Sequence, residues 1–267
     1  SARPHHTLWG DAFVRLRRNR LAVVGAVLII SLALASIIVP LISPYEFDEQ
    51  NLDAVLEGPS SAHLLGTDGL GRDVFTRLFY GARTSLAVGI FTQLIVLAIG
   101  LPIGALAGYA GGRVDNLLMR FVDIVYAFPD LLLIILIRAI LGGSIYMIFL
   151  AIGLVAWVNV ARLVRGQILT LKQRDFTTAA RAMGGSGPYI TVRHLLPNSL
   201  GPIIVLITFG IPRAIFAEAA LSYIGIGVKP PTPSWGTMIF NGYQNIFGAP
   251  YLVVFPAIAV GILMLAF

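Results

Sequence analysis

The sequence of 267 residues contains no cysteine, which excludes disulfides, thiol nucleophiles and cysteine-based metal sites. Its four histidines are scattered without the spacing of a metal-binding motif such as H-E-x-x-H, so no metal site is predicted. The glycine-rich stretch GGSGPYIT at 184–191 lacks the lysine of a nucleotide-binding P-loop, so the chain is not expected to bind ATP itself. No G-x-S-x-G or comparable catalytic set is present, so no catalytic residue is predicted and an enzyme is disfavoured.

Charge is also scarce in this chain. Charged residues make up 12% of it and hydrophobic residues 57%, whereas a soluble domain has roughly 25% charged residues. This composition predicts a membrane protein. The net charge of +6 could indicate nucleic-acid binding, but the basic residues flank apolar runs instead of forming one patch with aromatics. The lipid bilayer is therefore the expected partner, and nucleic acid is not.

Long apolar runs predict an all-α fold. A polar segment, 1–20, precedes the uncharged run 21–42, which at 1.5 Å per residue spans about 30 Å and could cross a bilayer. The Ala-Leu-Ala at 33–35 resembles a signal-peptidase site, but the apolar run continues beyond it. An uncleaved first span is therefore favoured.

Five further spans are predicted, giving six transmembrane helices. The further spans are 86–112, 117–141, 145–164, 200–224 and 251–267. The first span and the five-helix core, 86–267, are joined by an extracytoplasmic segment, 43–85, and the last two spans by a loop rich in Pro, Gly and Asn. With a cytoplasmic N-terminus, the inside segments hold thirteen of the nineteen Lys and Arg residues and the outside segments four. This bias places both termini and the loop 166–198 in the cytoplasm.

The stretch 175–198 in this loop, DFTTAARAMGGSGPYITVRHLLPN, is predicted to form two short helices. Phe176, Ala179, Ala180 and Met183 have the spacing of one helical face. Three glycines after Met183 would end the first helix; Ser186 and Pro188 would begin the second, which would run to Pro197. The pair would dock another protein, or lie on the lipid surface as an interfacial amphipathic hairpin.

This stretch resembles the coupling loop of the transmembrane subunits of bacterial ABC importers. That family has Glu-Ala-Ala, three residues, Gly, and later a hydrophobic residue with Leu-Pro. The matching and adjacent positions here, which the resemblance implies as the ATPase contact, are Phe176, Thr178, Ala179, Ala180, Met183, Gly184, Gly185, Leu196 and Pro197. Thr178 departs from the family Glu, so an ion pair made by that Glu would be absent or replaced.

Other segments are similar to the dipeptide, oligopeptide and nickel branch of these importers, in the subunit type with a basic N-terminal segment. They are LLGTDGLGRDVFTRLFYGARTSLAVG (64–89), GYAGGRVDNLLMRFVDIVYAFPDLLL (108–133) and AEAALSYIGIGVKPPTPSWGTMI (217–239). Members of this branch normally continue past the sixth span into a short cytoplasmic tail. The stop at Phe267 is therefore expected to be a truncation.

The resemblance implies an importer in the bacterial inner membrane that moves di- or oligopeptides by alternating access. Its implied partners are a homologous second permease, two ATP-binding subunits that carry ATP and Mg, and an extracytoplasmic substrate-binding protein. No cofactor is expected in this chain. Nickel or another small solute is the alternative substrate. A secondary transporter without ATPase partners is the rival class, although neither inverted repeats nor paired broken helices are evident in the sequence.

Two sets of charges have open roles. Ionisable residues at membrane depth tend to face protein or water, and those predicted there are Asp123, Asp130, Arg138, Arg213 and Glu218. Some could line the pore, or they could form structural ion pairs between spans. Arg213 and Glu218 lie about 140° apart around a helix, so a pair between them is not expected. The acidic outer segment 43–85 could contact the binding protein, cap the pore entrance or be a solvated loop.

Overall fold

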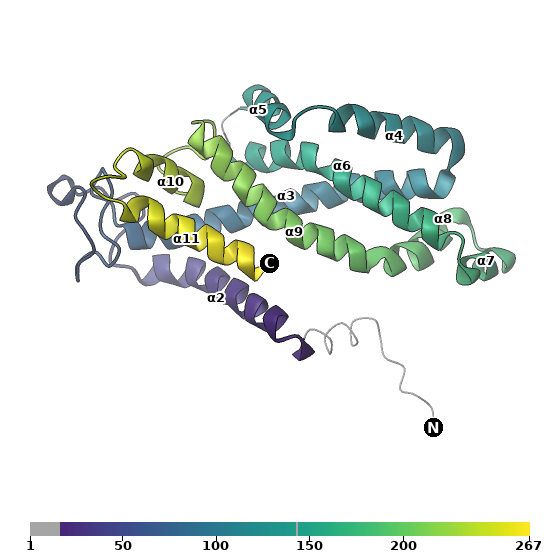
Figure 1. Ribbon diagram of the computed structural model, residues 1–267, viewed down its shortest axis with the longest axis horizontal. Coiled ribbons are helices and arrows are strands. Elements are labelled where there is room, and N and C mark those ends of the chain that lie inside the picture. Colours follow the sequence, from purple (N-terminus) through teal and green to yellow (C-terminus); the bar gives the residue numbers. More distant parts are fainter. Residues whose placement is uncertain (1–16, 143) are drawn as a thin grey trace. The chain divides into compact units, whose positions relative to one another are not determined.

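The computed structural model of the chain describes residues 17–142 and 144–267, so most of the predicted segment 1–20 lies outside the described residues. The regular elements of the described part are helices, and they belong to two compact units. The first unit is Ser1–Thr84 with Pro231–Phe267, and the second is Ser85–Pro230. Figure 1 labels α2 (Arg20–Ile42), α3 (Val74–Ala110), α4 (Gly112–Tyr126), α5 (Asp130–Leu141), α6 (Ile145–Leu171), α7 (Asp175–Ala182), α8 (Gly187–Ile190), α9 (Leu196–Tyr223), α10 (Trp235–Tyr243) and α11 (Tyr251–Ala266).

The first unit joins the two ends of the chain. Helix α2 approaches α11 so closely at Gly25 that a Cβ there would clash with the backbone of Ala266. The Tyr251 hydroxyl lies 2.8 Å from the carbonyl oxygen of Glu57 and 2.9 Å from that of Thr67. These contacts connect α2, α11 and the segment between α2 and α3 in one packed body.

The segment between α2 and α3 is folded around two aspartates. Asp73 Oδ2 accepts a hydrogen bond from the Thr76 amide at 2.7 Å, and Asp73 Oδ1 lies 3.0 Å from His63 Nδ1. Asp68 pairs with Arg72 at 2.8 Å and lies 3.5 Å from Arg77. Because Asp73 satisfies a free amide at the start of α3, that helix begins at Val74, inside the predicted outer segment. The solvated-loop interpretation of 43–85 therefore does not describe these residues.

The second unit is built around α6. Helices α4, α5 and α9 pack against it, and α3 approaches it through Gly100, Gly104 and Gly108 (Figure 1). A Cβ at Gly104 would clash with the Ala161 carbonyl and lie 2.8 Å from Val164 Cβ. Small residues every four positions let two membrane helices approach closely. This interface therefore requires the glycines.

The region predicted as one span, 117–141, is two helices in the structure. Helices α4 and α5 meet at an angle of 88° across Ala127–Pro129. Pro129 disfavours the helical conformation of Phe128 before it, so the helix ends there. Helix α4 also carries Asp115, whose carboxylate accepts two hydrogen bonds from Arg165 of α6 at 2.5 and 2.7 Å. The predicted third span is therefore a bent helix pair, which is either one broken span or a re-entrant loop.

Two further regions differ from the sequence predictions. The loop predicted before the last span contains α10, which begins with a capping box between Ser234 and Thr237. The second helix of the 175–198 stretch does not end at Pro197 but runs on into α9 through a π turn, Thr191–Leu195. In that turn the Leu196 amide bonds to the Thr191 carbonyl, five residues back. Pro197 falls in the first turn of α9, where its missing N–H costs little.

Among the described residues, four helices are long and apolar enough to cross a membrane: α2, α3, α6 and the helix Gly187–Tyr223. The bent pair α4 and α5 raises the number to five if it counts as one span. Helix α11 is apolar but has only 16 residues. The chain is therefore an all-helical membrane protein with four or five apolar spans by this measure.

Candidate functional site

Helix α7 follows α6 after a three-residue turn and is held by its buried side. The Thr177 hydroxyl donates to the Leu171 carbonyl at 2.8 Å, and Thr177 is fully buried. Ala180 is 5% exposed and belongs to the hydrophobic cluster that includes Ile168 and Ile190. The packed side of α7 is thus made of Thr177 and Ala180, which tie it to the end of α6.

The turn after α7 is a Schellman motif. Gly184 has φ +85°, the Gly184 amide donates to the Arg181 carbonyl and the Gly185 amide donates to the Ala180 carbonyl, each at 3.0 Å. The glycine prediction is confirmed here, because a residue with a Cβ is strained at that φ. Ser186 has the extended backbone of an N-cap, but its side chain makes no capping hydrogen bond.

Both ends of the hairpin, residues 172–190, meet Tyr109 near the end of α3. Lys172 Nζ donates to the Tyr109 carbonyl at 2.5 Å and lies 5.1 Å from the centre of its ring. On the other side, a Cβ at Gly187 would lie 2.6 Å from Tyr109 Cε1. The hairpin is therefore fixed to α3 as well as to α6. Sequence reasoning missed Tyr109, Lys172 and Thr177, because their contacts join residues from different helices.

The opposite side of α7 is open to solvent. Met183 is 82% exposed and Phe176 39%, and Thr178, Ala179 and Gly184 are also exposed. Gly185, Leu196 and Pro197 are half-buried. The predicted face is corrected at one position. Ala180 is buried on the packed side of α7, whereas Phe176 and Met183 are exposed. The exposed face of the hairpin also includes Tyr189, at 54%, and Val192 in the π turn after it is 66% exposed.

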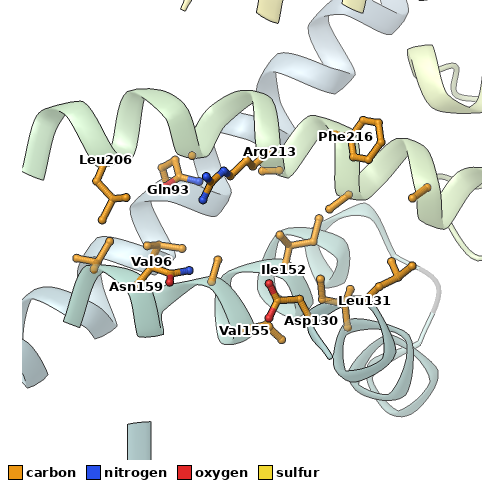
Figure 2. A pocket seen from close by; sticks show the side chains of 17 residues that line it. Gln93, Val96, Asp130, Leu131, Ile152, Val155, Asn159, Leu206, Arg213 and Phe216 are labelled. Carbon is orange, nitrogen blue, oxygen red and sulfur yellow. The ribbon is translucent and has the colours of Figure 1, made fainter. Parts of the chain in front are cut away.

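A pocket of about 270 Å³ lies between α3, α5, α6 and α9 in the second unit. Its walls are mostly apolar, with Val96, Ile152, Val155, Leu206 and Phe216 among them (Figure 2). Four polar side chains also line it: Gln93, Asp130, Asn159 and Arg213. Figure 2 shows Arg213 reaching in from α9 and Asp130 from the start of α5. The pocket thus combines an apolar surface with one charge of each sign.

The five charges predicted at membrane depth take different positions. Asp130 and Arg213 line the pocket. Asp123 pairs with Arg162 at 2.6 Å, and the Arg162 guanidinium lies 3.9 Å from the centre of the Tyr126 ring. Glu218 is fully buried and accepts a hydrogen bond from the Ser222 hydroxyl at 2.6 Å.

Arg138 is 4% exposed and donates to backbone carbonyls. Its Nε and Nη2 reach Ile226 and Gly227 at 3.2 Å each, and its Nη1 reaches Ser144 at 2.9 Å and also Gly142. These bonds join the end of α5 to the loop after α9, so Arg138 has a structural role. Of the two interpretations of the charged set, the structural one describes Arg138 and the Asp123 pair.

A helical membrane protein with a loop hairpin fixed to two of its spans, and with an apolar pocket between these two spans and two further helices, has the features of a transporter subunit. The model of the family "Binding-protein-dependent transport system inner membrane component" matches residues 100–267. A second model, "N-terminal TM domain of oligopeptide transport permease C", matches residues 7–59. The chain belongs to the family of binding-protein-dependent transport permeases.

Curated relatives match nearly the whole chain. The oligopeptide transport system permease protein OppC of Bacillus subtilis (strain 168) is 40% identical, over 98% of this chain and 86% of its own. The dipeptide transport system permease protein DppC of Alkalihalophilus pseudofirmus is 43% identical, over 97% and 85%. The glutathione transport system permease protein GsiD of Escherichia coli O6:H1 is 41% identical, over 98% and 86%.

The fold is similar to that in a solved structure of the MetNI methionine ABC transporter in an inward-facing conformation. The TM-score is 0.58 at 22% identity, covering 70% of this chain and 89% of that chain. The chain is accordingly a multi-pass inner-membrane permease of a binding-protein-dependent ABC importer, in which partner subunits hydrolyse ATP.

Proposed function

We propose that this permease imports peptides and that the exposed face of its hairpin receives the motion of an ATP-binding subunit. The oligopeptide, dipeptide and glutathione permeases that it resembles support a peptide substrate. The observation that carries the coupling role is the hairpin itself. One side is locked to Leu171 and Tyr109, and the other presents Phe176 and Met183 to solvent.

This arrangement suits mechanical transmission. A force applied to Met183 would act on a helix that is bonded to α6 through Thr177 and to α3 through Lys172. Helices α3 and α6 are themselves packed closely through glycines, so the two would move together. Rigid helices that move as one body are the basis of alternating access.

The proposal includes six crossings, with α11 as the sixth and the bent pair as the third, and both termini in the cytoplasm. The proposal keeps the predicted first span, outer segment and core at 21–42, 43–85 and 86–267. The helix α3 of the core, however, already begins at Val74. A homologous second permease would complete the pore, two ATP-binding subunits with Mg would dock on the hairpins, and a binding protein would deliver substrate outside. The folded segment 43–73 is the proposed contact for the binding protein.

Peptide is favoured over nickel by the pocket. A nickel path needs histidine, carboxylate or sulfur ligands near one another. Among the described residues no group of three or more His, Cys, Asp or Glu side chains could hold a metal ion, and Arg213 in the pocket would repel a cation.

The experiment is purification of the complex from its own membrane, followed by reconstitution into liposomes with the co-purified binding protein. Native mass spectrometry should detect a second permease and two ATP-binding chains. Uptake of labelled Ala-Phe should require ATP, and nickel uptake should be absent. Peptide uptake by this chain alone without ATP would instead support the secondary-transporter class.

A further inference from the structure

Three of the four polar side chains of the pocket, Gln93, Asn159 and Arg213, lie at similar depth. Asn159 is 12 residues before the end of α6 at Leu171, and Gln93 is 17 residues before the end of α3 at Ala110. Arg213 is 17 residues after the start of α9 at Leu196. At 1.5 Å per residue these positions are about 18 to 26 Å from helix ends that all adjoin the hairpin. The pocket is therefore near the middle of the membrane, where lipid-facing polar groups are costly.

None of the four has a side-chain hydrogen bond or ion pair within residues 17–142 and 144–267. Gln93 is only 6% exposed, so its amide is removed from bulk water and directed into the pocket. Buried polar groups normally have a partner. The missing partner of the buried Gln93, in the same pocket as the exposed guanidinium of Arg213, therefore points to a ligand that brings hydrogen-bonding groups of its own.

The pocket wall makes room for this amide. Gly210 of α9 faces Gln93, and a Cβ at that position would clash with the Gln93 side-chain oxygen. Both residues line the pocket, together with Arg213 one turn further along α9. Gly210 thus leaves room for the Gln93 amide in the pocket that Arg213 also lines. A purely apolar packing surface would not need this arrangement.

The chemistry of the walls selects one class of ligand. A guanidinium and an amide N–H donor suit a carboxylate, with which arginine forms strong charge-assisted bonds. Asp130 lies in the first turn of α5 and offers an anion for an ammonium group. Phe216, Leu131 and Ile152 provide an apolar surface between them. A volume of about 270 Å³ lies just below the ~300 Å³ at which drug-sized sites begin, which suits a short molecule.

We propose that this pocket is a transient subsite for zwitterionic peptides during transport, in which Arg213 and Gln93 hold the carboxylate and Asp130 the ammonium. The inference rests on the proposed peptide import and adds to it a binding site within this subunit. Asn159 would bond to the peptide group between the two termini. Selection by the permease would then follow selection by the binding protein.

The test is equilibrium binding to the complete complex in nanodiscs without its binding protein. The probes are Ala-Phe, its C-terminal amide and its N-acetyl derivative. Loss of a hydrogen bond to a charged group typically weakens binding about tenfold or more, so Ala-Phe should bind at least about tenfold more tightly than either derivative. This comparison needs no variant and remains valid if a variant fails to fold.

Variants then show which residue binds the carboxylate of the peptide and which binds its amine. Arg213→Gln should remove the preference for the free carboxylate and keep the preference for the free amine. Asp130→Asn should do the reverse, and Arg213→Lys should restore part of the carboxylate preference. Lys229→Gln, a change of an exposed basic residue outside the pocket, should alter neither.

Equal binding of the three probes, or equal losses for all three in both variants, would overturn the subsite. ATP-dependent uptake of Ala-Phe is measured on the same preparation with the binding protein added. Normal uptake without discrimination between the probes refutes the subsite alone. Absence of peptide uptake in the wild type refutes the proposed function, and the subsite with it.

Discussion

Arg138 and Arg213 both lie in apolar helices, but their surroundings are opposite. Arg138, near the end of α5, is buried and donates to four backbone carbonyls from two loops. Arg213, on α9, is exposed in a pocket and has no partner in the described part of the chain. The same residue type is thus a structural tie in one region and an unsatisfied cation in the other. In the second unit, an arginine with several hydrogen-bond partners thus marks a packed region, and an arginine without a partner marks an open surface.

The largest difference is expected when both arginines are changed to leucine. Arg138→Leu removes four hydrogen bonds donated by a buried charged group, one of them to the carbonyl of the buried Gly227, so it should destabilise the fold by about 3 kcal/mol or more. Arg213→Leu removes no such bond and should shift the thermal midpoint little. Thermal unfolding of the two variants in nanodiscs makes the comparison. Equal shifts would mean that Arg213 has a structural partner.

A smaller loss of stability is expected at the interface of α3 with α6. Gly104→Ala places a methyl group against the Ala161 carbonyl, and such overpacking typically costs about 1–3 kcal/mol. Gly166→Ala, in α6, is the matched control, because no atom lies within 4 Å of a Cβ at Gly166. The thermal midpoint should fall for Gly104→Ala only. Because Gly→Ala by itself raises helix propensity, a comparable fall in both variants would contradict the role given to the close approach at Gly104.

Thr177 and Thr178 offer a comparison between neighbours in α7. Thr177→Val removes the hydrogen bond to Leu171 and should cost about 1 kcal/mol, while Thr178→Val changes an exposed side chain. Hydrogen exchange at 172–183 should increase in the first variant and stay unchanged in the second. ATP-driven uptake should fall with Thr177→Val, because the hairpin is then held less firmly. Increased exchange in both variants would contradict the assignment of the packed side.

The smallest effect on stability is expected on the exposed face. The double change Phe176→Ser with Met183→Ser removes solvent-exposed apolar groups, so stability should stay within about 0.5 kcal/mol. ATP-dependent uptake should nevertheless be lost, since this face is the proposed contact with the ATP-binding subunit. Phe247→Ser, at a fully exposed residue between α10 and α11, is the control and should transport normally. Normal uptake by the double variant would exclude this face as the contact.

The sequence predicted those parts of the fold that depend on local composition. The runs 21–42, 145–164 and 200–224 correspond to α2, α6 and α9, and the glycine turn at Gly184 has the expected backbone. The bend within 117–141 was missed because average hydropathy outweighed a local signal, Pro129. Helix α10 was also missed, although the spacing of Ser234 and Thr237 is that of a capping box.

The candidate site was predictable only in part. The spacing of the exposed residues of α7 could be read from the sequence, but the burial of Ala180 depends on α6 and α8. The pairing of Asp115 with Arg165 spans 50 positions, and no local pattern indicates it. Asn159, a lone amide in an apolar run, was a signal for the pocket that could have been used. The sequence alone could not show which of the five charges face that pocket, because this depends on the packing of four helices.

The π turn Thr191–Leu195 has a consequence for the rotational phase of α9. A turn with i→i−5 bonds holds one residue more than a regular turn, so it absorbs an extra residue without rotating the helix beyond it. Deletion of one residue within this turn would restore a regular helix and leave Arg213 facing the pocket. The same deletion a few residues later, inside α9, would turn Arg213 by about 100° away from it. The segment Thr191–Leu195 is thus where this chain tolerates a change in length between hairpin and pocket.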